Sequence, residues 1–75
     1  MSLVDIVPSG LKSNGESTTQ YARGHFKLNE IGKTRLYIYK NNPPYIKFEL
    51  DDVYVFYNDK DPMLTKQLFE QLQKQ

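Results

Sequence analysis

The chain has 75 residues, a net charge of +1 and no cysteine. This length suits a single small domain. The lack of cysteine excludes disulfide bonds and thiolate metal sites, and it favours the reducing, cytoplasmic side of the cell. Hydrophobic residues make up 39% of the chain and charged residues 25%, a balance typical of a folded globular domain.

Neither a transmembrane span nor a signal peptide is expected from the sequence. Attachment to a membrane through a longer parent chain is left open. Residues 1–3 are typical of an expression-vector remnant, so we set them aside from the functional argument.

Charge is unevenly distributed along the chain. Every charged residue between positions 21 and 47 is basic except Glu30. Every charged residue between positions 49 and 61 is acidic except Lys60. One interpretation is that the two segments form neighbouring strands whose outward-facing charges attract each other. Each such cross-strand pair stabilises a sheet by about 0.2–1 kcal/mol. The alternative is a basic surface for an acidic partner, and no uninterrupted block of like charges decides between the two.

The first part of the chain predicts β-structure. Residues 4–7 form a short β-prone run. Asn14 and Gly15 predict a hairpin turn, since both residues tolerate positive φ. A mobile loop is the alternative for residues 9–20, which are mostly polar. Residues 21–28 then alternate between apolar and polar side chains, and Gly24 within them indicates a bend or bulge.

Three further strands follow. Residues 33–40 and 45–50 alternate with the period of a half-buried strand. Residues 53–57 are mostly apolar and predict a strand that is covered on both faces. Short turns at residues 30–32 and 51–52, together with a proline-containing connection, join these strands in order, so an antiparallel meander is expected.

The last segment changes to a helical period. Asp61 is a typical N-cap, and Pro62 suits the first helical position. The apolar residues that follow share one stripe of the helix: Leu64, Leu68, Phe69 and Leu72. The predicted fold is therefore α+β: a curved antiparallel sheet or partly open barrel of five to six strands in a meander, capped by one C-terminal amphipathic helix.

Several segments together carry a family resemblance. They are Val4–Val7, Tyr21–Phe26, Thr34–Ile38, Pro44–Phe48, Tyr54–Phe56, Asn58–Pro62 and Thr65–Leu72. In this order of strands and one terminal helix, the chain resembles a bacterial PH-like domain of the pleckstrin-homology superfold. The resemblance implies a non-catalytic interaction or regulatory module, often attached to a membrane protein.

A complete PH-like barrel has seven strands, more than this sequence predicts. We therefore expect residues 1–75 to form a single PH-like domain that lacks one or two N-terminal strands. Those strands would lie outside this sequence or be supplied by a second copy.

The side chains suited to chemistry do not form a recognisable set. His25 lies on the polar side of its strand, and nothing in the sequence pairs it with a nucleophile and an acid. The aspartates at positions 51, 52, 59 and 61 lack the regular spacing and the glycine of a calcium loop. We therefore expect no enzymatic activity, no metal site and no cofactor.

The candidate interaction surface lies in a basic hairpin over residues 33–47. Its members alternate on the outward faces of two strands: Arg35, Tyr37, Tyr39, Tyr45 and Lys47. Tyrosine-rich faces stabilise sheets and suit protein interfaces, so the expected function is protein binding, with self-association as one form. Peripheral binding to an anionic membrane through this hairpin is the alternative. Nucleic acid, which aromatic and basic residues can also hold, is less favoured.

Overall fold

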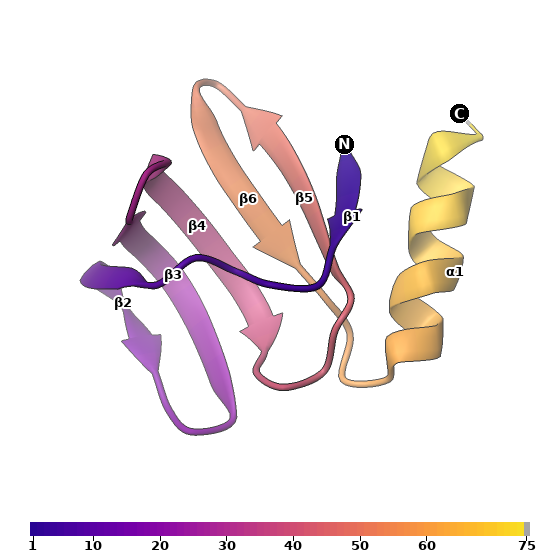
Figure 1. Ribbon diagram of the computed structural model, residues 1–75, viewed down its shortest axis with the longest axis horizontal. Coiled ribbons are helices and arrows are strands. Elements are labelled where there is room, and N and C mark those ends of the chain that lie inside the picture. Colours follow the sequence, from indigo (N-terminus) through magenta and orange to yellow (C-terminus); the bar gives the residue numbers. More distant parts are fainter. Residues whose placement is uncertain (75) are drawn as a thin grey trace.

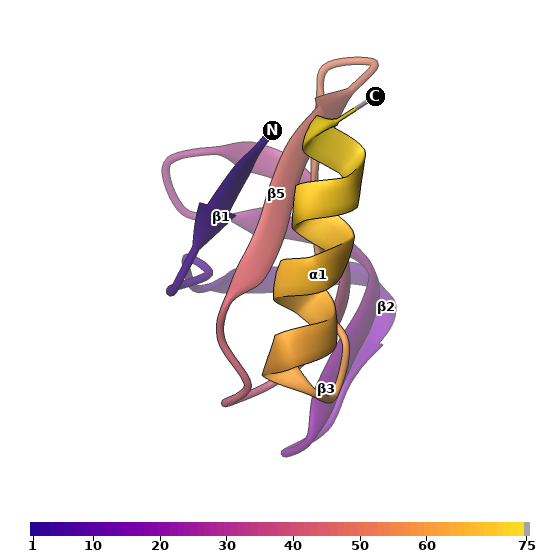
Figure 2. The same ribbon diagram turned by 90° about the vertical axis from the view of Figure 1, so that its right-hand side faces the viewer.

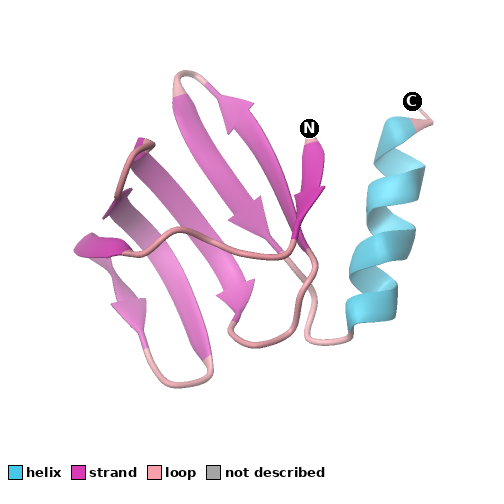
Figure 3. Ribbon diagram, viewed as in Figure 1, coloured by secondary structure: helices cyan, strands magenta, loops and turns pink. Residues whose placement is uncertain are grey.

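The structure is a computed structural model that describes residues 1–74. In these residues six strands form one open, curved sheet and precede one C-terminal helix (Figure 1, Figure 3). This arrangement confirms the predicted α+β fold class. The elements are β1 Ser2–Val4, β2 Gly10–Ser17, β3 Tyr21–Leu28, β4 Gly32–Tyr39, β5 Tyr45–Leu50, β6 Val53–Tyr57 and α1 Pro62–Gln73.

The order of the strands differs from a simple meander. Strands β2, β3 and β4 are consecutive and antiparallel, and β5 and β6 form an antiparallel hairpin. However, β6 lies between β4 and β5 and runs parallel to β4, which gives the order β1-β5-β6-β4-β3-β2. The predicted uninterrupted antiparallel meander is therefore wrong at this step. The loop over residues 40–44 joins β4 to β5 and leaves a gap of one strand between them. The later strand β6, which is the most apolar, fills this gap and so lies inside the sheet.

Two of the predicted turns are confirmed and one is wrong. Glu30, Asp51 and Asp52 have positive φ values of 73°, 52° and 65°, as tight turns between strands require. Asn14 and Gly15 lie instead within β2, opposite His25 and Gly24 of β3. The turn between β2 and β3 follows Ser17, a few residues later.

One face of the sheet, here called the inner face, carries the main core. Its buried members are Ala22, Phe26, Leu28, Leu36, Ile38, Tyr45 and Phe56. Residues 5–9, the crossing segment, join β1 to β2 and pass across this face (Figure 1). Val7 packs against the core, and the Asn29 amide donates a 2.8 Å hydrogen bond to the Ser9 carbonyl oxygen. The inner face is thus covered by an irregular segment.

The helix lies on the opposite, outer face, where it packs mainly on β5 (Figure 2). Asp61 is its N-cap and accepts a 2.9 Å hydrogen bond from the Met63 amide, which confirms the predicted start. Thr65 is fully buried, and its hydroxyl oxygen accepts a 2.8 Å hydrogen bond from the Asp59 amide. These bonds fix the connection between the end of β6 and the start of α1. The described residues contain no helix long and apolar enough to cross a bilayer.

The apolar stripe of α1 is only partly covered. Leu68 and Phe69 are half-buried, whereas Leu64 and Leu72 remain exposed. Beneath the helix, Ile46 of β5 is 1% exposed. The helix therefore covers the start of β5 at Ile46 but leaves Leu50, at the end of β5, and a flank of its own apolar stripe open.

Candidate functional site

An apolar groove, here called the outer groove, runs between α1 and the outer face of the sheet. Its volume is about 440 Å³. It is lined by Arg35, Tyr37, Ile46, Phe48, Leu50, Val55, Tyr57, Leu68 and Leu72. The lining comes from three strands and the helix, so the groove depends on β6 lying between β4 and β5.

Large apolar side chains at this groove are exposed to solvent. Leu50 is 56% exposed, Tyr37 44% and Tyr57 36%. Single exposed apolar residues are common on protein surfaces, but a contiguous set indicates a binding surface. The outer groove is such a set because the register pairs Tyr37 with Tyr57, and Tyr57 in turn with Ile46 of β5.

The same outer face becomes basic and aromatic on β4 and β3. The register places Arg23 beside Tyr37, His25 beside Arg35 and Lys27 beside Lys33. We call these six residues, with Tyr21 and Tyr39 from the next pair, the basic strip. The Arg23 guanidinium lies 4.8 Å from the centre of the Tyr21 ring, which is a cation–π contact within the basic strip.

An acidic residue limits the basic strip at its β2 side. Glu16 is paired with Arg23, and its carboxylate accepts a hydrogen bond from the Tyr21 hydroxyl. That hydrogen bond raises the pKa of Tyr21 above its ordinary value of 10.0. At the other end, Lys33 lies near the turn that carries Asp51 and Asp52, since Thr34 is paired with Tyr54. Arg35 lies in the middle of the strip, between these two acidic ends.

The structure divides the predicted interaction surface between two faces. Arg35, Tyr37 and Tyr39 lie together on the outer face, as predicted. Tyr45 does not join them, because it is 7% exposed and belongs to the inner core. Lys47 also lies on the inner face, with its ammonium 4.8 Å from the centre of the Tyr54 ring.

The reason for this correction is the strand order. The prediction treated residues 33–47 as a hairpin with one outward face, but β6 separates β4 from β5. On β5 the even-numbered residues face α1, so the odd-numbered ones, including Tyr45 and Lys47, face the inner core.

The sequence argument missed the contribution of β3. Arg23, His25 and Lys27 complete the basic strip beside β4, and all three are exposed. Their alternation with Ala22 and Phe26 was the available signal, because it places them on one face of a strand. The outer groove had no such signal, since it depends on which strands are neighbours.

The described part of the chain contains no candidate metal site. Within residues 1–74, no three His, Cys, Asp or Glu side chains lie close enough together to hold a metal ion. His25, as predicted, is exposed at the surface. The arrangement on the outer face is suited to binding an anionic and apolar group.

Comparisons with protein-family models, with curated proteins and with solved structures gave no match. The PH-like resemblance therefore stays a prediction. The parallel pair of β4 and β6 departs from the antiparallel sheet that the resemblance implies.

Proposed function

We propose that this domain is a non-catalytic interaction module whose outer face binds an apolar and acidic segment of a protein partner. The observation that carries the proposal is that the apolar outer groove and the basic strip adjoin each other on the same face of the sheet. They share Arg35 and Tyr37, so a partner filling the groove also meets the cations. The proposal does not depend on the PH-like resemblance, which independently implies an interaction module.

The chemistry of the partner follows from charge complementarity. Arg35 is exposed at the groove. Arg23 is its diagonal neighbour on the outer face, because Arg23 is paired with Tyr37 and His25 with Arg35. A carboxylate at this point gains a bidentate hydrogen bond that a neutral partner cannot supply. Leucine-like side chains of the same segment would bury the exposed surfaces of Tyr57 and Leu72.

A recessed groove favours a protein segment over a membrane surface. The groove lies between Leu72 of α1 and Tyr37 of β4, and its floor includes buried Val55. A narrow segment such as a helix reaches this floor, whereas a bilayer surface is too broad to enter it. A second copy of the chain is a competing occupant, because the exposed flank of α1 and the groove lie on one continuous surface.

The test uses two synthetic amphipathic peptides about four helical turns long. One has leucine on one face and glutamate on the other, and the matched peptide has lysine in place of every glutamate. We expect the glutamate peptide to shift amide resonances of β4, β6 and α1, with binding that weakens as salt rises. R35E should weaken binding at least about tenfold, whereas K60E, an exposed change in the loop before α1, should not.

Other outcomes overturn the proposal and identify the occupant. Equal binding of both peptides, or no binding of either at about 1 mM, contradicts a charge-selective groove. Co-sedimentation with phosphatidylserine vesicles, without peptide binding, assigns the face to a membrane. A dimer that persists at low concentration by light scattering and dissociates on L72E would assign the groove to self-association.

A further inference from the structure

The inner face contains a second cavity that is separate from the outer groove. It lies beneath and beside the crossing segment of residues 5–9 and has a volume of about 460 Å³. This is within the range of about 300–1,000 Å³ that is usual for small-molecule sites. The helix lies on the other face, so access to this cavity depends on an irregular segment that crosses the sheet (Figure 1).

The walls of the cavity are mainly hydrocarbon. Its floor is formed by buried side chains of the main core: Ala22, Phe26, Leu28, Leu36, Ile38 and Tyr45. Val7 and Pro8 of the crossing segment complete the lining. Each floor residue is at most 7% exposed, so a ligand here would touch the core itself.

A cation stands at the rim. Lys40 lines the cavity and is half-buried, and its ammonium donates a 2.8 Å hydrogen bond to the Ser17 hydroxyl. Its backbone amide is held by a 2.8 Å hydrogen bond to the Gln20 carbonyl oxygen. The hydroxyl partner is neutral, so it orients the ammonium without cancelling its charge. Lys40 is therefore positioned to receive an anion.

The rim also limits the charge of the ligand. Asp5 of the crossing segment lines the same cavity, so a second anionic group on the ligand would meet a carboxylate. One anionic head near Lys40 and Ser17, followed by a hydrocarbon body, matches this lining. Asn41 and Tyr45 add an amide and a phenol to the lining for further hydrogen bonds.

From this arrangement we infer that the inner cavity binds a small amphipathic monocarboxylate. The carboxylate pairs with the Lys40 ammonium and accepts from the Ser17 hydroxyl. The hydrocarbon body lies beneath the crossing segment on Phe26, Leu36 and Ile38. This site is independent of the protein-binding face, since it lies on the other side of the sheet.

The experiment compares three probes of equal chain length: decanoate, decanol and decyltrimethylammonium, each below its micelle concentration. Binding is followed through the methyl resonances of Leu28, Leu36 and Ile38. Decanoate should shift these methyl groups in a saturable way and bind at least about tenfold more tightly than decyltrimethylammonium, as one favourable charge pair allows.

Two variants separate the inner cavity from the outer groove. K40M should weaken decanoate binding about tenfold or more and leave decanol binding unchanged. R35Q, which alters the cation of the outer groove, should leave decanoate binding as it is. An unchanged methyl spectrum of free K40M would show that the fold is intact.

Three results would overturn the inference. The first is equal binding of the anionic and cationic probes. The second is decanoate binding that K40M does not change. The third is a set of shifts confined to α1 and β6, or no shift at all, because either places the ligand outside the inner cavity.

Discussion

Replacing Asn58 by alanine should remove more stability than any other polar-to-alanine change near β6. Asn58 follows β6 directly and is 1% exposed. Its side-chain oxygen accepts a 2.6 Å hydrogen bond from the Tyr39 amide. Its side-chain nitrogen donates to the carbonyl oxygens of Tyr39, at 3.0 Å, and Asn42, at 2.9 Å. The amide side chain thus extends the pairing of β4 and β6 beyond the last backbone pair.

The magnitude follows from the three groups that lose their partner. A typical intramolecular hydrogen bond contributes about 0.5–1.5 kcal/mol, and a buried group left without a partner costs about 1–3 kcal/mol. We expect N58A to lower the free energy of unfolding by about 3 kcal/mol, with water reaching part of the site. A core of this size provides only about 3–5 kcal/mol, so N58A should leave the domain close to its folding midpoint in water.

The assay is urea unfolding followed by far-ultraviolet circular dichroism. With a slope of about 1 kcal/mol per molar urea, the midpoint of N58A should fall by about 3 M. N29A is the matched control, because Asn29 is exposed and its side chain makes one 3.4 Å hydrogen bond, to the Ser9 hydroxyl. A loss below about 1 kcal/mol for N58A, or one equal to that of N29A, would refute the role assigned to this side chain.

Three smaller predictions test the helix cap, the β2–β3 contact and one titration. D61A should lower the free energy of unfolding by about 1 kcal/mol in the same urea assay, because it removes the N-cap acceptor. G24A should cost more than about 1 kcal/mol, since Gly24 has a φ of +106° and an added Cβ would lie 2.7 Å from the Gly15 Cα; a neutral result would show that β2 yields easily. In an NMR titration, E16Q should lower the raised pKa of Tyr21. In the wild type, the hydrogen bond from Tyr21 to Glu16 should persist below pH 10 and be lost as the pH rises through the raised pKa of Tyr21. An unchanged pKa of Tyr21 in E16Q would contradict the role of this hydrogen bond.

Local signals in the sequence predicted local structure well. The turn at Asp51 and Asp52 and the helix start at Asp61 depend on residues that are adjacent in the chain. The strand face of Leu36 and Ile38 was also predictable, because alternation along one strand settles which side chains share a face.

The turn predicted at Asn14 and Gly15 was wrong because glycine also occurs within strands, where it lets two backbones approach closely. In the structure Gly15 lies opposite Gly24, and a Cβ on Gly15 would lie 2.5 Å from the Arg23 carbonyl oxygen. This glycine permits close approach of two strands within the sheet. The real turn is stabilised by the Thr18 hydroxyl oxygen, which accepts hydrogen bonds from the amides of Gln20, at 3.1 Å, and Tyr21, at 3.0 Å.

The strand order could not be read from alternation, and the candidate site depends on it. Alternation specifies the two faces of β5 but not which face meets the helix. One signal did point to the observed order: residues 53–57 predicted a strand covered on both faces, which is the environment of a strand inside a sheet. In the structure Val55 and Phe56, on opposite faces of β6, are both buried.

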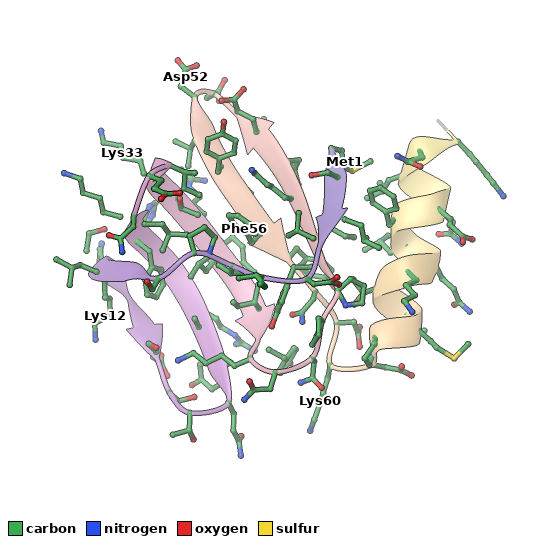
Figure 4. The ribbon with its side chains drawn as sticks, viewed as in Figure 1. Met1, Lys12, Lys33, Asp52, Phe56 and Lys60 are labelled. Atoms are coloured by element: carbon green, nitrogen blue, oxygen red, sulfur yellow. The ribbon has the colours of Figure 1, made fainter. Side chains whose placement is uncertain are left out.

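The two binding proposals share a physical origin in the small size of the domain. A six-stranded sheet has two faces to cover, and this chain covers one with a 12-residue helix and the other with the crossing segment. The labelled charged residues Lys12, Lys33 and Asp52 lie at the margin of the sheet, while Phe56 lies at its centre (Figure 4). Apolar surface therefore remains beside each covering element.

Any ligand that fills either place should also stabilise the fold. A partner that binds the folded chain and not the unfolded one adds RT ln(1 + [L]/Kd), about 2.7 kcal/mol at a hundredfold excess over Kd. That increment approaches the whole free energy expected for a core of this size. Ligand at either site should therefore raise the urea midpoint, and it should restore folding to a marginal variant such as N58A. The two ligands should do so additively, since the outer groove and the inner cavity lie on opposite faces and share no lining residue.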